Sequence, residues 1–382
     1  MNALPVAAAE ALARPAKSTA RRSQRLSVPE LDGLRALAML IVCVKHVVQA
    51  TTPSWMRSDV PMLNYLMQES GYLAVSFFFV LSGFLVSQPF VAWARDPGGK
   101  PLAIGRYART RVLRVFPAWW VCFAIVALVS APETYTNLPH LALFLTLHQN
   151  YDPDIIRTVV SPAWSLCIDV AFYLALPALF LGMRALRPRR PVRVAVLAIV
   201  AFWIGTIAFN AIWFSPENVP HPDLRPLSFS LLSFGGQFAI GLLLAIGFPE
   251  LERLRRIPLA PCGLVLLLAT TQLIRPDHPN LARPAMVLAC GLLFAGVLQR
   301  RTMGRLAPLR SRLLKRFADR SYGLYLWHLP VFHAMEHFNI VERGVAWHTA
   351  HALALMMSIA WICAWASATF VELPLRRRLA LR

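Results

Sequence analysis

Charged residues are scarce in this sequence, and acidic ones are scarcer than basic ones. Only 15% of the 382 residues are charged, 57% are hydrophobic, and the mean hydropathy is +0.51. Soluble globular domains carry about 25% charged residues, so this composition excludes an ordinary soluble fold and indicates a membrane protein with several spans. The alternation of apolar and polar residues that marks a transmembrane strand is also lacking, which excludes a barrel.

Paired cysteines, glycine-rich phosphate loops and internal repeats are lacking too. The six cysteines have no paired spacing, so neither a disulfide framework nor a metal site is expected. Nothing in the sequence marks a second folded domain. We expect one transmembrane domain over residues 31–375, preceded by a disordered cytoplasmic tail at 1–30 and followed by a basic cytoplasmic tail at 376–382.

Long apolar segments are what the sequence does have. With this much chain inside lipid, only a helical bundle satisfies the backbone hydrogen bonds. The expected fold class is therefore all-α, a polytopic membrane protein with about ten transmembrane helices in one bundle. The ten segments lie near 34–50, 72–92, 112–131, 163–183, 193–214, 227–247, 259–274, 284–299, 321–341 and 349–370.

The net charge of +20 is distributed unevenly along the chain. With the N-terminus in the cytoplasm, 31 of the 39 Lys and Arg residues fall in cytoplasmic segments, six fall outside, and Arg35 and Lys45 lie in the first helix. This is the positive-inside pattern, and it predicts the plasma (inner) membrane with both termini cytoplasmic. The basic residues are thus expected to contact anionic membrane lipid, and no nucleic-acid partner is expected.

The first apolar segment holds an arginine and a histidine on one helix face. Arg35 and His46 stand eleven positions apart, which brings them within about 20° of one direction and about 16 Å apart along a helix axis. An ionisable side chain inside the bilayer is costly and points to function. We therefore expect His46 near mid-membrane to be a functional residue.

Two further ionisable residues are expected at membrane depth. Asp169 lies in the fourth span and His328 in the ninth, so both could converge with His46 near the midplane. A carboxylate beside a histidine can hold its tautomer and stabilise the imidazolium, which activates a hydroxyl nucleophile. The alternative is that each residue makes a structural polar contact between helices.

Arginines also cluster where the third span begins. Arg106, Arg109, Arg111 and Arg114 occupy two to three helical turns, with Arg111 and Arg114 at i and i+3. Arginine forks suit phosphate and pyrophosphate, so this cluster could bind a nucleotide-bearing donor from the cytoplasm. The alternative, which composition alone favours, is a charge cluster that only sets topology.

Six segments, taken together in order, resemble the acyltransferase 3 family of integral-membrane O-acyltransferases over most of residues 30–375. They are LDGLRALAMLIVCVKH with Arg35 and His46, GYLAVSFFFVLSGFLVS with Phe78, Phe79, Ser82 and Gly83, RVLRVFP with Arg111 and Arg114, SPAWSLCIDVAFYLALP with Trp164, Ser165, Leu166, Phe172 and Tyr173, SYGLYLWHLP with Tyr322, Leu326 and His328, and VELP with Glu372 and Pro374. Two positions depart from the family pattern. Ser76 replaces an acid on the second helix, where no catalytic acid is therefore expected, and Asp169 replaces a glutamate on the fourth.

The resemblance implies an O-acyltransferase that moves an acyl group, expected to be acetyl, from acyl-CoA to a hydroxyl. No bound cofactor is implied, because acyl-CoA is a co-substrate. Arg111 and Arg114, with Arg35, would hold the CoA phosphates. His46 would be the general base or relay the acyl group, and Asp169 would orient it. The further candidate site residues are His328, Ser82 and Trp164.

The resemblance leaves the acceptor open among cell-surface glycans, lipid-linked sugars and glycosylated antibiotics. The hydrolase-like domain appended in some relatives is not found here, so the chain is expected to finish the transfer itself or to use a separate periplasmic or extracellular partner. Two other classes of function fit intramembrane charge. One is a transporter or flippase of lipid-linked sugars, although the halves lack the symmetry typical of such proteins; the other is a non-catalytic membrane subunit.

Overall fold

The computed structural model describes residues 28–59, 61–96, 102–186, 188–213, 225–251, 253–254, 256–273, 279–300 and 306–380, and this part of the chain is helical, with no strand. Most of the tail predicted at 1–30 lies outside the described residues, and the first described helix begins at Pro29. Of the basic tail predicted at 376–382, residues 376–380 are described, and they form the last turns of the short helix Leu373–Ala380.

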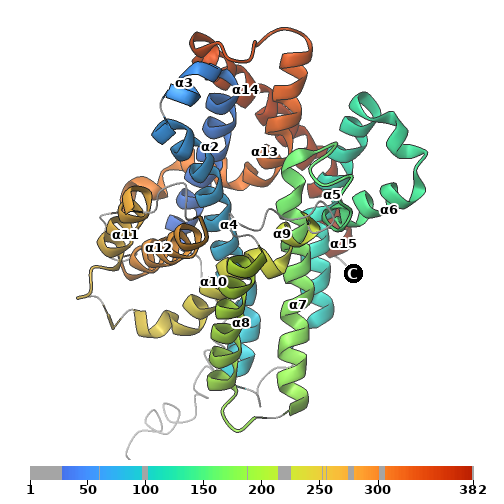
Figure 1. Ribbon diagram of the computed structural model, residues 1–382. Coiled ribbons are helices and arrows are strands. Elements are labelled where there is room, and N and C mark those ends of the chain that lie inside the picture. The colour runs from blue at the N-terminus through green and yellow to red at the C-terminus, as the bar shows by residue number, and fades with distance from the viewer. Residues whose placement is uncertain are drawn as a thin grey trace, which may run out of the picture.

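Ten long helices make up most of the described part of the chain, and Figure 1 shows how they are arranged. They are α2 (Pro29–Thr51), α4 (Pro61–Arg95), α5 (Ile104–Ser130), α7 (Trp164–Leu186), α8 (Pro191–Trp213), α10 (Leu231–Leu251), α11 (Leu259–Leu273), α12 (Pro279–Arg300), α13 (Arg312–His337) and α14 (Thr349–Ser367). Shorter helices are α3 (Ser54–Asp59), α6 (Leu138–Thr146), α9 (Arg225–Ser228) and α15 (Leu373–Ala380). Each of the ten predicted apolar segments overlaps one of the long helices.

The count of about ten transmembrane helices is not confirmed. Among the described residues, six helical stretches are long and apolar enough to cross a membrane. They are Glu69–Arg95, Ile104–Ser130, Ser161–Leu186, Pro191–Trp213, Arg225–Leu251 and Ala346–Arg378. The apolar parts of α11 and α12 are shorter, and α2 and α13 are not among the six. Both of the latter carry charged side chains along their length.

Helix α4 packs against α2, α7, α8, α10 and α12 and so holds a central place in the bundle (Figure 1). Its closest approach is to α10, where the two backbones nearly touch. A Cβ on Gly83 would collide with the backbone of Phe238, and one on Gly241 would collide with the backbone oxygen of Val80. Small residues allow such close helix packing in membranes, where dispersion contacts replace the hydrophobic effect as the driving force.

The apolar side chains form two clusters that meet along α4 and α7. One cluster is built mainly from α4, α7, α10 and α12, with Phe84, Phe238 and Phe294 fully buried. The other is built mainly from α2, α5, α13 and α14, with Trp119 and Phe123 fully buried. The seam between the two clusters is where polar side chains collect.

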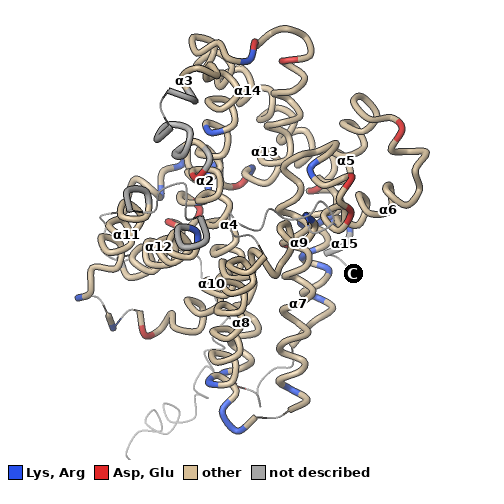
Figure 2. Tube along the Cα trace, viewed as in Figure 1, with Lys and Arg blue, Asp and Glu red and all other residues tan. Residues whose placement is uncertain are grey.

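Charged residues gather at particular turns of the bundle, one of them the connection between α7 and α8 (Figure 2). Four arginines lie in or beside this connection: Arg184, Arg189, Arg190 and Arg193. At the start of α2, Glu30 is completely buried and accepts a hydrogen bond from Nε of Arg310 at 2.8 Å. This ion pair joins the first turn of α2 to the turn that precedes α13, and it thereby places α2 beside α13.

Candidate functional site

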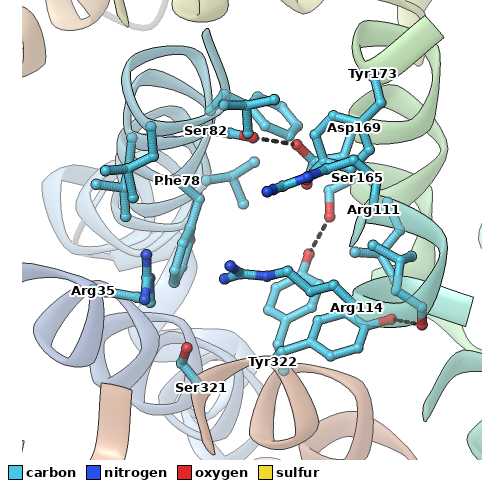
Figure 3. Close-up of a pocket in the computed structure, with 18 residues that line it drawn as sticks. Arg35, Phe78, Ser82, Arg111, Arg114, Ser165, Asp169, Tyr173, Ser321 and Tyr322 are labelled. Atoms are coloured by element: carbon cyan, nitrogen blue, oxygen red, sulfur yellow. Dashed lines mark hydrogen bonds between the residues drawn. The ribbon is translucent and has the colours of Figure 1, made fainter. Parts of the chain in front are cut away.

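A cavity of about 120 Å³ lies at the seam, between α2, α4, α5, α7 and α13. Five of the predicted site residues line it: Arg35, Ser82, Arg111, Arg114 and Asp169. Figure 3 shows the three guanidinium groups pointing into the same space, with Arg35 entering from α2 and the other two entering from α5. The tertiary structure therefore brings the arginine of the first helix to the arginine pair of the third predicted span.

The arginines are held by their neighbours before any ligand binds. Arg35 pairs with Asp32 one helical turn earlier, at 3.4 Å, and its side chain is 15% exposed. The guanidinium of Arg111 lies 5.9 Å from the ring centre of Tyr107 and 5.7 Å from that of Tyr173. Its Nε is buried without a hydrogen-bond partner among the described residues. Stacking on aromatic rings fixes the guanidinium plane, which leaves its N–H groups available to a ligand.

The cavity also contains one acidic side chain. Asp169 lies on α7, and its Oδ1 accepts a hydrogen bond from the Ser82 hydroxyl of α4 at 3.0 Å (Figure 3). A hydrogen bond to a charged acceptor is stronger than one between neutral groups. With three arginines and one aspartate on its wall, the cavity has a cationic lining that suits an anionic ligand.

A histidine pair lies beside the cavity. The ring of His46 on α2 is 5.4 Å from that of His328 on α13, centre to centre. His328 is completely buried, and its Nδ1 lies 2.7 Å from the carbonyl oxygen of Tyr325. Because a carbonyl only accepts, Nδ1 must carry the proton, and Nε2 of the neutral ring is then an acceptor. This Nε2 is buried without a partner among the described residues.

That Asp169 orients His46 remains a prediction, because no contact between these two side chains is seen among the described residues. The hydrogen bond seen for its carboxylate goes to Ser82, and the ring that lies against His46 belongs to His328. Tyr325 lines the cavity, and its ring centre is 5.6 Å from that of His328. Helical rise in the sequence predicts a depth for Asp169, but it does not predict the hydrogen bond to Ser82.

Trp164, the remaining candidate, lies outside the cavity lining. Its ring packs against Phe229 and Phe234 at 5.4 and 5.2 Å between ring centres. It thus connects the start of α7 to α10 and the segment before it, and its observed contacts are packing contacts.

The cavity has lining residues that were not predicted as site residues. Tyr173, Tyr322 and Tyr325 contribute rings, and Ser165 contributes a hydroxyl that lies 2.8 Å from the Tyr325 hydroxyl. All four belong to the segments SPAWSLCIDVAFYLALP and SYGLYLWHLP. The tyrosines of these apolar helices could have indicated a polar site between the helices, because a buried tyrosine hydroxyl needs a hydrogen-bond partner.

Comparison with known proteins gives one family. The sequence model of the acyltransferase domain matches residues 28–365. Peptidoglycan O-acetyltransferase OatA of Listeria monocytogenes is 26% identical over 390 residues, which cover 94% of this chain and 57% of that protein. Acyltransferase MdmB of Streptomyces mycarofaciens is 28% identical over 382 residues, which cover 93% of each protein.

A third relative, the putative peptidoglycan O-acetyltransferase YrhL of Bacillus subtilis, is 26% identical over 91% of this chain and 55% of its own length. The chain therefore spans just over half of the two peptidoglycan O-acetyltransferases and nearly all of the Streptomyces protein. No solved structure is significantly similar to the chain.

Proposed function

Because the chain belongs to the acyltransferase family, whose domain covers residues 28–365, we propose that it transfers an acetyl group from acetyl-CoA to a hydroxyl of a glycan or a glycosylated metabolite. The observation that carries this proposal is the convergence of Arg35, Arg111 and Arg114 on one cavity that also holds Asp169. Guanidinium groups that can bind phosphate share this cavity with an ionisable carboxylate. This combination suits a donor that carries phosphates and a reactive thioester.

The arginines bind the donor in this proposal. Guanidinium groups pair with phosphate oxygens through two parallel hydrogen bonds, which fixes orientation as well as charge. The phosphates of acetyl-CoA lie on Arg111 and Arg114, with Arg35 facing them from α2. The thioester end then extends past Tyr325 toward the histidine pair, whose His328 ring is 5.6 Å from that tyrosine.

His46 is the general base. The acceptor hydroxyl attacks the thioester carbonyl as His46 removes its proton, so that a C–O bond forms, the C–S bond breaks, and the proton passes from the imidazolium to the departing CoA thiolate. His328 positions His46, because its Nε2 can accept the N–H of His46 and leave the other nitrogen free as the base. The charge of Asp169, held by Ser82, offsets part of the arginine charge at the donor site.

The acceptor follows from the relatives by analogy. Two of the similar proteins are named as peptidoglycan O-acetyltransferases, which supports a glycan acceptor in the cell envelope. MdmB is named only as an acyltransferase, and this chain matches 93% of its length. The positive-inside charge pattern supports a plasma-membrane enzyme whose termini and arginine cavity face the cytoplasm. A separate partner on the outer side could complete the transfer.

The test is transfer of radiolabel from acetyl-CoA by the purified full chain in lipid nanodiscs. The labelled acetyl group should be hydrolysed slowly and should be transferred quickly to an added glycan. His46→Ala should lose both the hydrolysis and the transfer. A transporter would carry sugars without consuming the thioester, and a non-catalytic subunit would leave the donor intact. Either result would overturn the proposal.

A further inference from the structure

A second cavity, of about 130 Å³, lies against α4. It is enclosed by α4, α8, α9, α10 and α12. A buried water needs about 10–15 Å³ on such a measure, so this space has room for a ligand rather than a single water molecule. None of the residues proposed above for donor binding or proton transfer lines it.

Aromatic faces form part of the wall. Tyr72, Trp203 and Phe234 all line the cavity. Gly236 lies beside Trp203, and a Cβ there would meet the indole at 3.0 Å, so the absence of a side chain lets the indole pack close to α10. The guanidinium of Arg283 is 5.2 Å from the ring centre of Tyr72. Rigid aromatic rings supply apolar contact area at little conformational cost.

Amide and hydroxyl groups form the rest of the wall, and they are held in place. Gln237 is 2% exposed and donates from Nε2 to the Tyr72 hydroxyl at 3.0 Å. Asn210 donates to the Ser233 carbonyl at 2.9 Å, and the Ser233 hydroxyl donates back to Asn210 Oδ1. Fixed donors and acceptors around an apolar surface are typical of a site that selects a ligand by its hydroxyl groups.

One buried polar atom near this cavity lacks a partner. Glu69 lies one helical turn before Tyr72 on the same face of α4, within electrostatic range of Arg283. Its Oε2 is buried and makes no hydrogen bond within the described part of the chain. A buried carboxylate oxygen is costly to leave unpaired, so a ligand hydroxyl that donates to it would be stabilised.

The second cavity lies close to the chemistry proposed for the first. Phe79 lines the first cavity and Phe234 the second, and their ring centres are 5.8 Å apart. One residue before Tyr72 on α4, a Cβ at Gly71 would lie 3.1 Å from Cε of Lys45, the neighbour of His46. The turn of α4 that contributes Tyr72 to this cavity therefore also contacts the neighbour of the proposed base.

We propose that the second cavity is a saccharide-binding subsite, which holds one sugar ring of the acceptor while a hydroxyl elsewhere in that acceptor is acylated. A pyranose ring has an apolar C–H face, which fits Trp203 and Tyr72, and a hydroxyl edge, which fits Asn210, Ser233 and Gln237. Binding energy from a non-reacting part of a substrate can position the reacting part. The inference rests on the proposed function in taking this sugar to belong to the acceptor.

Binding alone is measured first, without any acyl donor. The full chain in lipid nanodiscs, free of glycoside detergent, is dialysed against radiolabelled N,N′-diacetylchitobiose, with maltose and sorbitol as competitors. The ring sugar maltose should compete and the acyclic sorbitol should not. Trp203→Leu should weaken binding at least about fivefold, because an aromatic contact of about 1 kcal/mol is lost, and Trp203→Phe should weaken it less.

The matched control is Trp213→Leu on the same helix, since Trp213 is 43% exposed and does not line the cavity. It should bind the sugar as the unaltered chain does. Equal binding by Trp203→Leu and Trp213→Leu, or full competition by sorbitol, would overturn the subsite.

Kinetics separate this inference from the proposed function. In the transfer assay, Trp203→Leu should raise the half-saturating concentration of the glycan at least about fivefold and leave that of acetyl-CoA where it was. Sugar binding that depends on Trp203 in a chain that transfers no acetyl group would refute the proposed function and retain the sugar site. Transfer whose acceptor constant is the same in Trp203→Leu would refute the subsite and retain the function.

Discussion

Replacing Arg111 by glutamine removes one guanidinium group from the arginine-lined cavity. It tests the first step of the proposed reaction, which is the binding of acetyl-CoA. Arg111 already lies against the rings of Tyr107 and Tyr173, and its Nε has no partner among the described residues. The ligand contact is therefore lost without a compensating rearrangement. A hydrogen bond to a charged group is worth about 1.5–3 kcal/mol. The half-saturating concentration of acetyl-CoA should thus rise about 10- to 150-fold.

The assay is release of the CoA thiol by the full chain in nanodiscs, followed over a range of acetyl-CoA concentrations. Arg111→Lys should recover only part of the loss, because an ammonium cannot form the two-pronged contact. The matched control is Arg106→Gln on the same helix, where the side chain is exposed and does not line the cavity. If the Arg111 and Arg106 variants saturate at the same donor concentration, the arginines of α5 set topology and do not bind the donor.

Three further predictions concern the base, the carboxylate and the helix packing. His46→Ala should abolish transfer with membrane insertion intact, and wild-type turnover in this variant, measured with the same radiolabel, would end the assignment of His46 as the base. Asp169→Asn and Ser82→Ala should each lower turnover. The double variant should lower turnover little more than the worse single variant does, because the 3.0 Å hydrogen bond couples the two side chains. Strictly additive losses of turnover would show that the two side chains act separately. Gly241→Ala should lower the thermal unfolding midpoint, because the added methyl group forces α4 away from α10 and destabilises the fold by about 1–3 kcal/mol. The control Gly247→Ala lies on the same helix, its Cβ would meet nothing within 4 Å, and its midpoint should not change. Equal midpoints for the two variants would contradict the close packing.

Helix positions were predictable because apolar length is a local property of the chain. All ten predicted segments overlap helices, since a run of apolar residues in lipid can satisfy its backbone only within itself. The number of spans was not predictable in the same way. The charged residues of α2 and α13 reduce their apolar character, and contacts between helices position them, as the pairing of the buried Glu30 with Arg310 shows for α2.

The sequence predicted candidate site residues one by one, but not the contacts between them. Ionisable side chains at membrane depth pointed to His46, Asp169 and His328, because such groups are too costly to retain without a role. The hydrogen bond of Asp169 to Ser82 was not among the predicted contacts. Helical rise gives the depth of a side chain, but its partner depends on how each helix is rotated and which neighbour it meets.

The sequence by itself determined the fold class, the helix positions and the family, and it pointed to the arginines that line the first cavity. Only the tertiary structure decided that Arg35 joins Arg111 and Arg114, that Asp169 bonds to Ser82, and that a second polar cavity lies against α4. The physical reason is the distance along the chain between the residues involved. Apolar periodicity and charge are properties of one helix, whereas these contacts depend on how helices that are far apart in the chain rotate and approach each other. Helices α4 and α10 approach closely because Gly83 and Gly241 have no side chains.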